Sequence, residues 1–102
     1  MAWFKPSFKK KFDQIRGGWS TSQVLDHIGS PLEVEDSEIP LGSDWGRQPG
    51  MTFEMKPGDP VKQWLFEDKG EYYYLWFAET DPTDENPWRV TLTKKMSHRI
   101  AA

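Results

Sequence analysis

The sequence predicts an α+β fold in which two N-terminal helices pack on one face of an antiparallel sheet of three or four strands. Two short segments before residue 30 place apolar residues at helical spacing. Three segments after residue 60 are rich in aromatic and β-branched residues, which is typical of strands. The length of 102 residues suits one domain, so we expect residues 1–102 to fold as a single unit.

The first predicted helix begins after Ser7, whose side chain can cap it. Phe8, Phe12 and Ile15 recur at i, i+4 and i+7, so they share one face of a helix. Gly17 is placed to adopt the left-handed conformation that commonly ends a helix. We expect the three apolar side chains to pack on the sheet and the intervening lysines to face water.

The second predicted helix has a clear N-terminal motif. Ser20 and Gln23 are spaced as a capping box, in which each side chain binds the main chain of the other residue. Gly29 is suited to end this helix. The side chains expected to pack on the sheet are Val24, Leu25 and Ile28.

Residues 30–60 contain many prolines and glycines, so the sequence predicts mostly loop here. Within it, residues 51–55 alternate between apolar and polar side chains, and we interpret them as a short edge strand. A connection of this length in a small domain is often functional, although a tolerated insertion fits equally well.

Three strands are predicted at residues 61–67, 71–79 and 88–95. The last strand alternates, so we expect Trp88, Val90 and Leu92 on one face. Arg89, Thr91 and Thr93 are then expected on the other face.

The turn between the first two of these strands allows two registers, and a shift of one residue exchanges the faces. If Lys69 and Gly70 form a two-residue turn, the core contains Trp64, Phe66, Tyr73, Leu75 and Phe77. A three-residue turn places Tyr72, Tyr74 and Trp76 inside instead; the preference of lysine for negative φ favours this register. We choose the two-residue turn because tyrosine and tryptophan tolerate exposure better than leucine and phenylalanine.

The chosen register leaves an aromatic stripe on the opposite face of the sheet. Exposed tyrosine and tryptophan are enriched at binding hot spots, so we expect this stripe to bind an unidentified partner protein. The alternative is that the loop at residues 32–60 covers it with Trp45, Phe53 and Met55. The predicted partner-binding residues are Tyr72, Tyr74, Trp76, Leu65, Arg89 and Thr91.

The sequence lacks the residues that are characteristic of several function classes. The chain has no cysteine, which excludes disulfides and thiolate chemistry. His27 and His98 are the only histidines, and neither has neighbours at metal-ligand spacing, so we predict no catalytic residue, no metal site and no cofactor. His27 is expected to be a surface residue near the end of its helix, and the acidic group at residues 81–85 is expected to be a solvated turn.

Charge and hydropathy limit the partners. Residues 1–16 hold five basic residues and one acidic residue, whereas the remainder holds eight basic and fifteen acidic residues. Such an acidic body argues against a nucleic-acid partner. No apolar run has the length of a bilayer span and the N-terminus lacks the apolar region of a signal peptide, so we expect a cytoplasmic location.

The stretch Lys11-Phe12-Asp13-Gln14-Ile15-Arg16-Gly17-Gly18-Trp19-Ser20-Thr21-Ser22-Gln23-Val24-Leu25-Asp26-His27-Ile28-Gly29-Ser30-Pro31 resembles a known helix–turn–helix motif. It is similar to that of the beta-lactamase-inhibitor-like and small outer-membrane lipoprotein (SmpA/OmlA, BamE-like) superfamily. Trp19 stands where that family usually has methionine, and the family's lipid-bearing cysteine is absent. The resemblance implies two helices on an antiparallel sheet and a non-enzymatic, protein-binding role.

We therefore expect a protein–protein interaction module that binds its partner through the aromatic face of the sheet. One alternative is a peripheral membrane protein that uses Trp3, Phe4, Phe8 and the neighbouring lysines. Another is a small hydrolase or ligand-binding domain, for which a polar pocket containing Asp, Glu or His is required.

Overall fold

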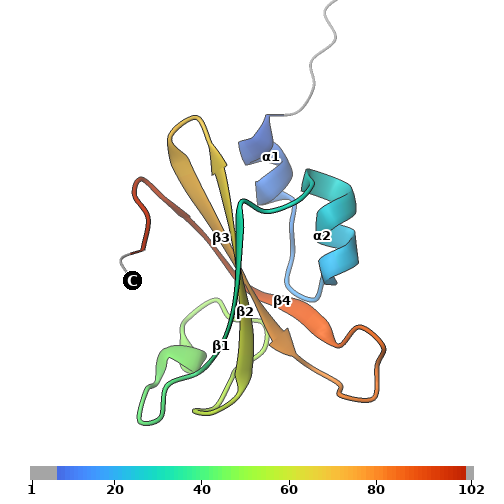
Figure 1. Cartoon of the computed structure of the whole chain (residues 1–102), viewed down its shortest axis with the longest axis vertical. Helices are drawn as coiled ribbons and strands as arrows, with labels where there is room; N and C mark the ends of the chain where they lie inside the picture. The colour runs from blue at the N-terminus through green and yellow to red at the C-terminus, as the bar shows by residue number, and fades with distance from the viewer. Residues whose placement is uncertain (1–6, 101–102) are drawn as a thin grey trace, which may run out of the picture.

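A four-stranded antiparallel sheet with strand order β1-β2-β3-β4 runs through the molecule, and two helices precede it in the chain (Figure 1). The computed structural model describes residues 7–100. The fold class is therefore α+β. The elements are α1 (Phe8–Asp13), α2 (Thr21–Ile28), β1 (Glu33–Glu38), the 3-10 helix η1 (Trp45–Arg47), β2 (Pro60–Asp68), β3 (Glu71–Glu79) and β4 (Trp88–Met96).

Both helices begin at the serine that the sequence indicates. The side chain of Ser7 accepts a hydrogen bond from the Lys10 N–H at 3.2 Å, and α1 follows. The expected end of α1 is wrong, because the helix stops at Asp13 and Gly18, not Gly17, has a positive φ of 93°. Gly17 instead lies so close to Thr52 that a Cβ there would overlap the threonine side chain.

The hairpin between β2 and β3 has the register of the two-residue turn. Trp64 pairs with Leu75 and Phe66 pairs with Tyr73, as predicted. Lys69 and Gly70 have φ values of 50° and 78°, so both turn residues are left-handed. Two positive φ values are typical of a type I′ turn, whose twist matches that of the flanking strands.

One hydrophobic cluster joins the helices to alternate residues of the sheet. Phe12, Ile15 and Val24 are buried in it. The ring of Phe8 lies 4.8 Å from that of Tyr73 and 5.7 Å from that of Phe66, measured between centroids. The strand residues of this cluster are Trp64, Phe66, Tyr73, Leu75, Phe77 and Val90, which include all five core residues expected from the chosen register.

Leu25 does not belong to this cluster, so its predicted core position is wrong. It is 40% exposed, whereas Val24 is completely buried and Ile28 packs against the cluster. Val24 and Ile28 are four residues apart and lie on one face of α2. Leu25 is about 100° further around the helix, so it points away from that face.

A β-bulge changes the alternation of β4. Phe77 pairs with Val90 but Trp76 pairs with Leu92, which leaves Thr91 as the extra residue. The prediction that Leu92 shares a face with Val90 is therefore wrong. Leu92 packs instead on the opposite face, with the cluster that contains Trp76.

The first strand of the sheet lies where the sequence did not predict one. β1 pairs with β2 from Glu33 opposite Leu65 to Glu38 opposite Pro60. In contrast, residues 51–55, which were expected to be an edge strand, form no strand. Their backbone bends at Thr52 and Phe53, which both bond to Thr91, and the Met55 N–H donates to the Gly46 carbonyl.

Candidate functional site

The predicted aromatic stripe lies on the sheet face opposite the helix cluster, but it is not open to solvent. Trp76 is 5% exposed, and Tyr74 and Leu65 are each 2% exposed. Their expected exposure is therefore wrong, and the alternative of a covering loop is correct. A second hydrophobic cluster contains the three residues together with Ile39, Met55, Val61 and Ala78, and Trp45, Met51 and Phe53 pack against it.

The segment between β1 and β2 forms this cover. The rings of Trp45 and Trp76 meet edge to face, with centroids 5.5 Å apart. The ring of Tyr74 stacks with that of Trp76 at a centroid distance of 5.6 Å, with an interplanar angle of 12°. The Trp76 indole Nε1–H donates to Gln63 Oε1 at 2.9 Å, so its polar atom has a partner inside the protein.

Thr91 attaches the covering segment to the sheet. Its main-chain oxygen accepts from the Thr52 N–H at 2.9 Å, and its hydroxyl both accepts from the Phe53 N–H and donates to the Phe53 carbonyl. Thr91 is 2% exposed. It was predicted to contact a partner, but its polar groups are satisfied by the chain itself.

The remaining two residues of the predicted site are partly accessible. Tyr72 is half-buried beside the second cluster. Arg89 forms an ion pair with Asp84 at 3.2 Å and donates to the Asn86 carbonyl at 2.6 Å. These contacts hold Arg89 against the turn before β4, on a different part of the surface from Tyr72.

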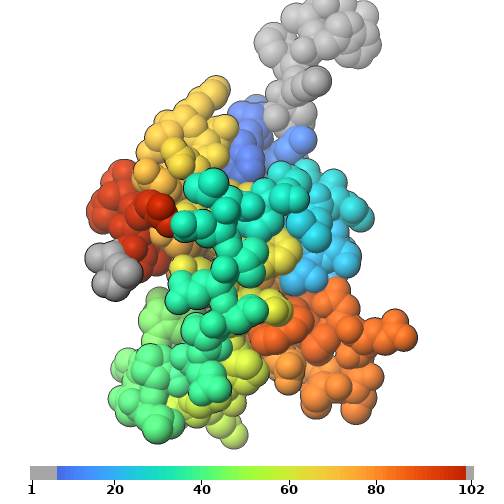
Figure 2. All heavy atoms as spheres, viewed as in Figure 1, coloured from blue at the N-terminus to red at the C-terminus, as the bar shows by residue number. Residues whose placement is uncertain are grey.

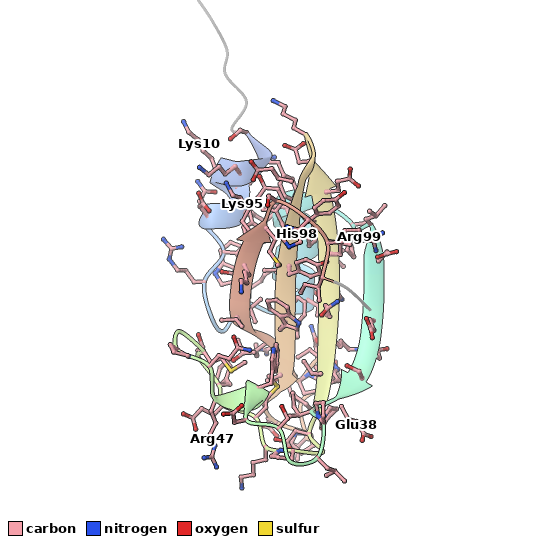
Figure 3. All side chains as sticks on the ribbon, turned by 90° about the vertical axis from the view of Figure 1, so that its left-hand side faces the viewer. Lys10, Glu38, Arg47, Lys95, His98 and Arg99 are labelled. Atoms are coloured by element: carbon pink, nitrogen blue, oxygen red, sulfur yellow. The ribbon has the colours of Figure 1, made fainter. Side chains whose placement is uncertain are left out.

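A groove of about 780 Å³ lies beside β1 on the aromatic side of the sheet. Glu33 and Glu35 form one wall, and Leu65 and Tyr74 are at its base. The C-terminal segment crosses the opposite side (Figure 3), where Arg99 forms an ion pair with Glu33. The Ile100 N–H donates to the Tyr74 hydroxyl at 2.9 Å, so the C-terminal segment bonds both an acidic and an aromatic residue of the groove.

β1 itself is exposed along its whole length. All six residues of the strand are accessible, and four of them are acidic: Glu33, Glu35, Asp36 and Glu38. Two large apolar side chains add to this surface, because Leu32 is 58% and Val34 is 55% exposed. Figure 2 shows this segment as an uninterrupted band across the front of the molecule.

Residues predicted to be structural have local partners. His27 Nε2 lies 2.8 Å from the Lys11 carbonyl, and the His27 ring meets that of Trp19 at 5.1 Å. Hydrogen bonds from the Thr83 hydroxyl and main chain lower the pKa of Asp81 below its ordinary value. The acidic segment around Asp81 is thus a solvated turn.

Within residues 7–100, no helix is both long and apolar enough to cross a membrane. The same part of the chain contains no group of three or more His, Asp or Glu residues arranged to hold a metal ion. The chain matches no family model, no curated protein and no solved structure.

The sequence did contain a sign of β1. Residues 32–39 hold neither proline nor glycine, although both are frequent in the rest of the segment before β2. Val34 and Ile39 are β-branched, which favours a strand. The sign was weak because the strand is acidic on both faces and lacks the apolar alternation that usually identifies one.

Proposed function

We propose that this chain is a non-enzymatic protein-binding module whose binding surface is the β1 edge with the adjoining groove. The observation that carries the proposal is the exposure of β1, an edge strand whose residues are all accessible and whose Val34 is 55% exposed. Exposed strand edges pair readily with other chains, and proteins normally cover or shorten them. An uncovered edge beside a groove is therefore a suitable surface for a partner.

The two faces of the sheet and the first part of the β4 edge offer less. In the described residues, the aromatic face contacts the segment before β2, and the helix cluster occupies the other face. The opposite edge is covered at Val90, which exchanges hydrogen bonds with Gly18 and Trp19 at 2.8 Å, and at Thr91, which bonds Thr52. We first expected the aromatic face to bind the partner. In this proposal the β1 edge and the adjoining groove bind it instead.

The architecture that we propose for this role has the two helices as a supporting layer on one face of the sheet. The supporting contacts are those of Phe8 and Phe12 with Tyr73, at centroid distances of 4.8 and 4.9 Å. The same contacts argue against the membrane-surface alternative, since these phenylalanines cannot pack on the sheet and enter a bilayer at once. Trp3 and Phe4, which that alternative also uses, lie outside the described residues.

Site-directed photo-crosslinking tests the proposal. A photoreactive phenylalanine analogue at position 34 would lie on the proposed surface, and the same analogue at exposed Ser22 on α2 gives a matched control. In cells that express the protein naturally, we expect a discrete protein adduct from position 34 and none from position 22. Adducts of equal yield from both positions, or none from position 34, would contradict the proposal.

A further inference from the structure

We propose that the β1 edge receives an extended, lysine- or arginine-rich segment of the partner, which adds to the sheet as a fifth strand. This inference rests on the proposed function and specifies the chemistry of its ligand. Three features carry it: the direction of the β1 main chain, the charge on both faces of the strand, and a basic segment of this chain that already contacts the same site.

The main-chain groups of β1 determine how a strand could bind. The Ile39 N–H donates to the Asp59 carbonyl at 2.9 Å, and the Ile39 carbonyl accepts from the Gly58 N–H at 2.7 Å. Ile39 therefore turns both groups toward the strand that follows. In antiparallel pairs this direction alternates along the chain. The main-chain groups of Val34, Asp36 and Glu38 consequently point away from β2, at the outer edge of the sheet.

No proline, glycine or bulge blocks that outer edge. β1 is continuous from Glu33 to Glu38, and its pairing with β2 is regular over all six residues. Figure 3 shows β1 at one side of the sheet, with no described segment beside its outer edge. An added strand could therefore form hydrogen bonds with three successive outward-facing residues, as in other complexes that extend a sheet.

The charge of β1 decides which strands can pair with it. Glu33 and Glu35 lie opposite Leu65 and Gln63, so they project on the aromatic side. Asp36 and Glu38 project on the other side, where Asp36 forms an ion pair with Lys62 at 2.9 Å. Like charges directly opposite each other destabilise a strand pair, and opposite charges stabilise it. The edge therefore disfavours β1 of a second copy and favours a basic strand.

The C-terminal segment shows the same chemistry within one molecule. Arg99 reaches Glu33 from the groove, and the next residue, Ile100, bonds the Tyr74 hydroxyl through its main chain. A basic side chain thus already contacts the aromatic side of β1, and the residue after it bonds Tyr74 of β3 at the base of the groove. Glu35, one step further along that side, has no ion-pair partner among the described residues.

The expected ligand follows from these positions. Lysine or arginine at alternate positions would lie on the aromatic side, near Glu33 and Glu35. Between them, a valine or isoleucine would lie on the other side and cover Val34, which is 55% exposed. Because side chains alternate between the faces of a strand, the ligand is a segment in which basic and β-branched residues alternate.

Binding of a labelled ten-residue peptide of alternating lysine and valine tests this inference, with fluorescence anisotropy as the readout. We expect saturable binding that weakens as salt is raised, because the contacting charges are exposed. A peptide of alternating glutamate and valine should not bind. A lysine–valine peptide with every backbone nitrogen methylated keeps its charge but has no N–H to pair as a strand, so it should bind at least about tenfold more weakly.

Two pairs of variants separate strand pairing from simple charge attraction. Asp36→Pro removes both the charge and an outward N–H, whereas Asp36→Ala removes the charge and keeps that N–H. Asp36→Pro should therefore bind the lysine peptide more weakly than Asp36→Ala does. Glu35→Lys should lower the affinity for the lysine peptide about tenfold. The glutamate peptide should bind this variant more tightly than it binds the original chain. Circular dichroism checks that each variant is folded. Glu35→Gln replaces Glu35→Lys if that variant is not folded, and the methylated peptide tests strand pairing if Asp36→Pro is not folded.

The possible results distinguish the two proposals. Equal binding of the methylated and unmethylated peptides would overturn the added strand. No binding of the lysine peptide, together with a protein adduct from position 34, would overturn the basic ligand and leave the protein-binding function intact. If the adduct is a second copy of this chain, and the protein sediments as a dimer, the edge is a self-association surface and the inference is wrong.

Discussion

Lys69 and Gly70 decide which residues of the central hairpin face the helices. Lys69 has a φ of 50°. This left-handed conformation is unfavourable for most residues other than glycine, asparagine and aspartate. The turn preference of lysine favoured the other register, and burial of Leu75 and Phe77 favoured this one. Both side chains are completely buried, so burial outweighs the strain of one turn residue.

The strain at Lys69 leads to a prediction about stability. Lys69→Asn should raise the free energy of unfolding by up to about 1 kcal/mol, because asparagine tolerates the left-handed conformation and Asn-Gly is a favoured type I′ pair. Urea denaturation measures the change. Lys94→Asn, at an exposed position of β4, is the control and should give no gain. A lower unfolding midpoint for Lys69→Asn would contradict the turn conformation described above.

The α2 helix is short, so its capping box should matter for its stability. The Ser20 hydroxyl accepts from the Gln23 N–H at 3.2 Å, and Gln23 Oε1 accepts from the Ser20 N–H at 2.8 Å. Helices of about eight residues are marginal on their own. Gly29, with a φ of 85°, ends α2 as the sequence indicated.

Ser20→Ala should therefore lower the free energy of unfolding by about 1 kcal/mol, the usual effect of losing an N-cap. Ser22→Ala changes an exposed hydroxyl in the same helix and serves as the control, with an expected change near zero. Thermal unfolding of both variants, followed by circular dichroism, provides the comparison. Equal midpoints would mean that the capping box does not stabilise α2.

The strands differ in how well the sequence predicts them, and the difference has a physical cause. β2, β3 and β4 lie within one residue of their expected ends because each buries aromatic or β-branched side chains. β1 buries none of its six residues, so it lacks the hydrophobic pattern that prediction requires. Its position depends on pairing with β2, which lies about thirty residues later in the sequence.

The sequence did not predict the bulge at Thr91 either. A strict alternation of two residues gave the right face for Val90 and the wrong face for Leu92. The extra residue is stabilised by the hydrogen bonds of Thr91 with Thr52 and Phe53. Those residues are nearly forty positions earlier, so local sequence contains no sign of the change in face.

The two apolar faces of β3 explain the layout of the whole molecule. Residues of α1 and α2 belong to the cluster that contains Leu75 and Phe77, and residues of the segment before β2 belong to the cluster that contains Tyr74 and Trp76. These two parts of the chain are separate in the molecule (Figure 1). The sequence predicted that both faces are apolar, but we expected the second face to be free, and it is covered. Trp45 and Phe53 belonged to the alternative in which the loop covers this face, but they lie in a segment rich in turns, so no local pattern showed that they converge.

Burial of the second face also changes the expected effect of replacing Trp76. Its indole contacts Trp45 and Tyr74 and donates to Gln63, inside a cluster where it is 5% exposed. Trp76→Ala should therefore lower the free energy of unfolding by about 3–5 kcal/mol, as for other buried tryptophans. That loss is a large fraction of the stability of a small domain, so much of the variant should be unfolded.

A milder replacement keeps this prediction testable if Trp76→Ala does not fold. Trp76→Phe retains an aromatic ring but removes the indole N–H, which leaves Gln63 Oε1 without its partner at 2.9 Å. We expect a smaller loss, of about 1–3 kcal/mol, from the unsatisfied group and the lost volume. In urea denaturation, Trp76→Phe should thus be less stable than the original chain, and Trp76→Ala should be less stable than Trp76→Phe. A Trp76→Ala protein with an unchanged unfolding midpoint would mean that the segment before β2 does not cover the aromatic face in solution, and the stripe of Tyr72, Tyr74 and Trp76 would again be a candidate for binding a partner.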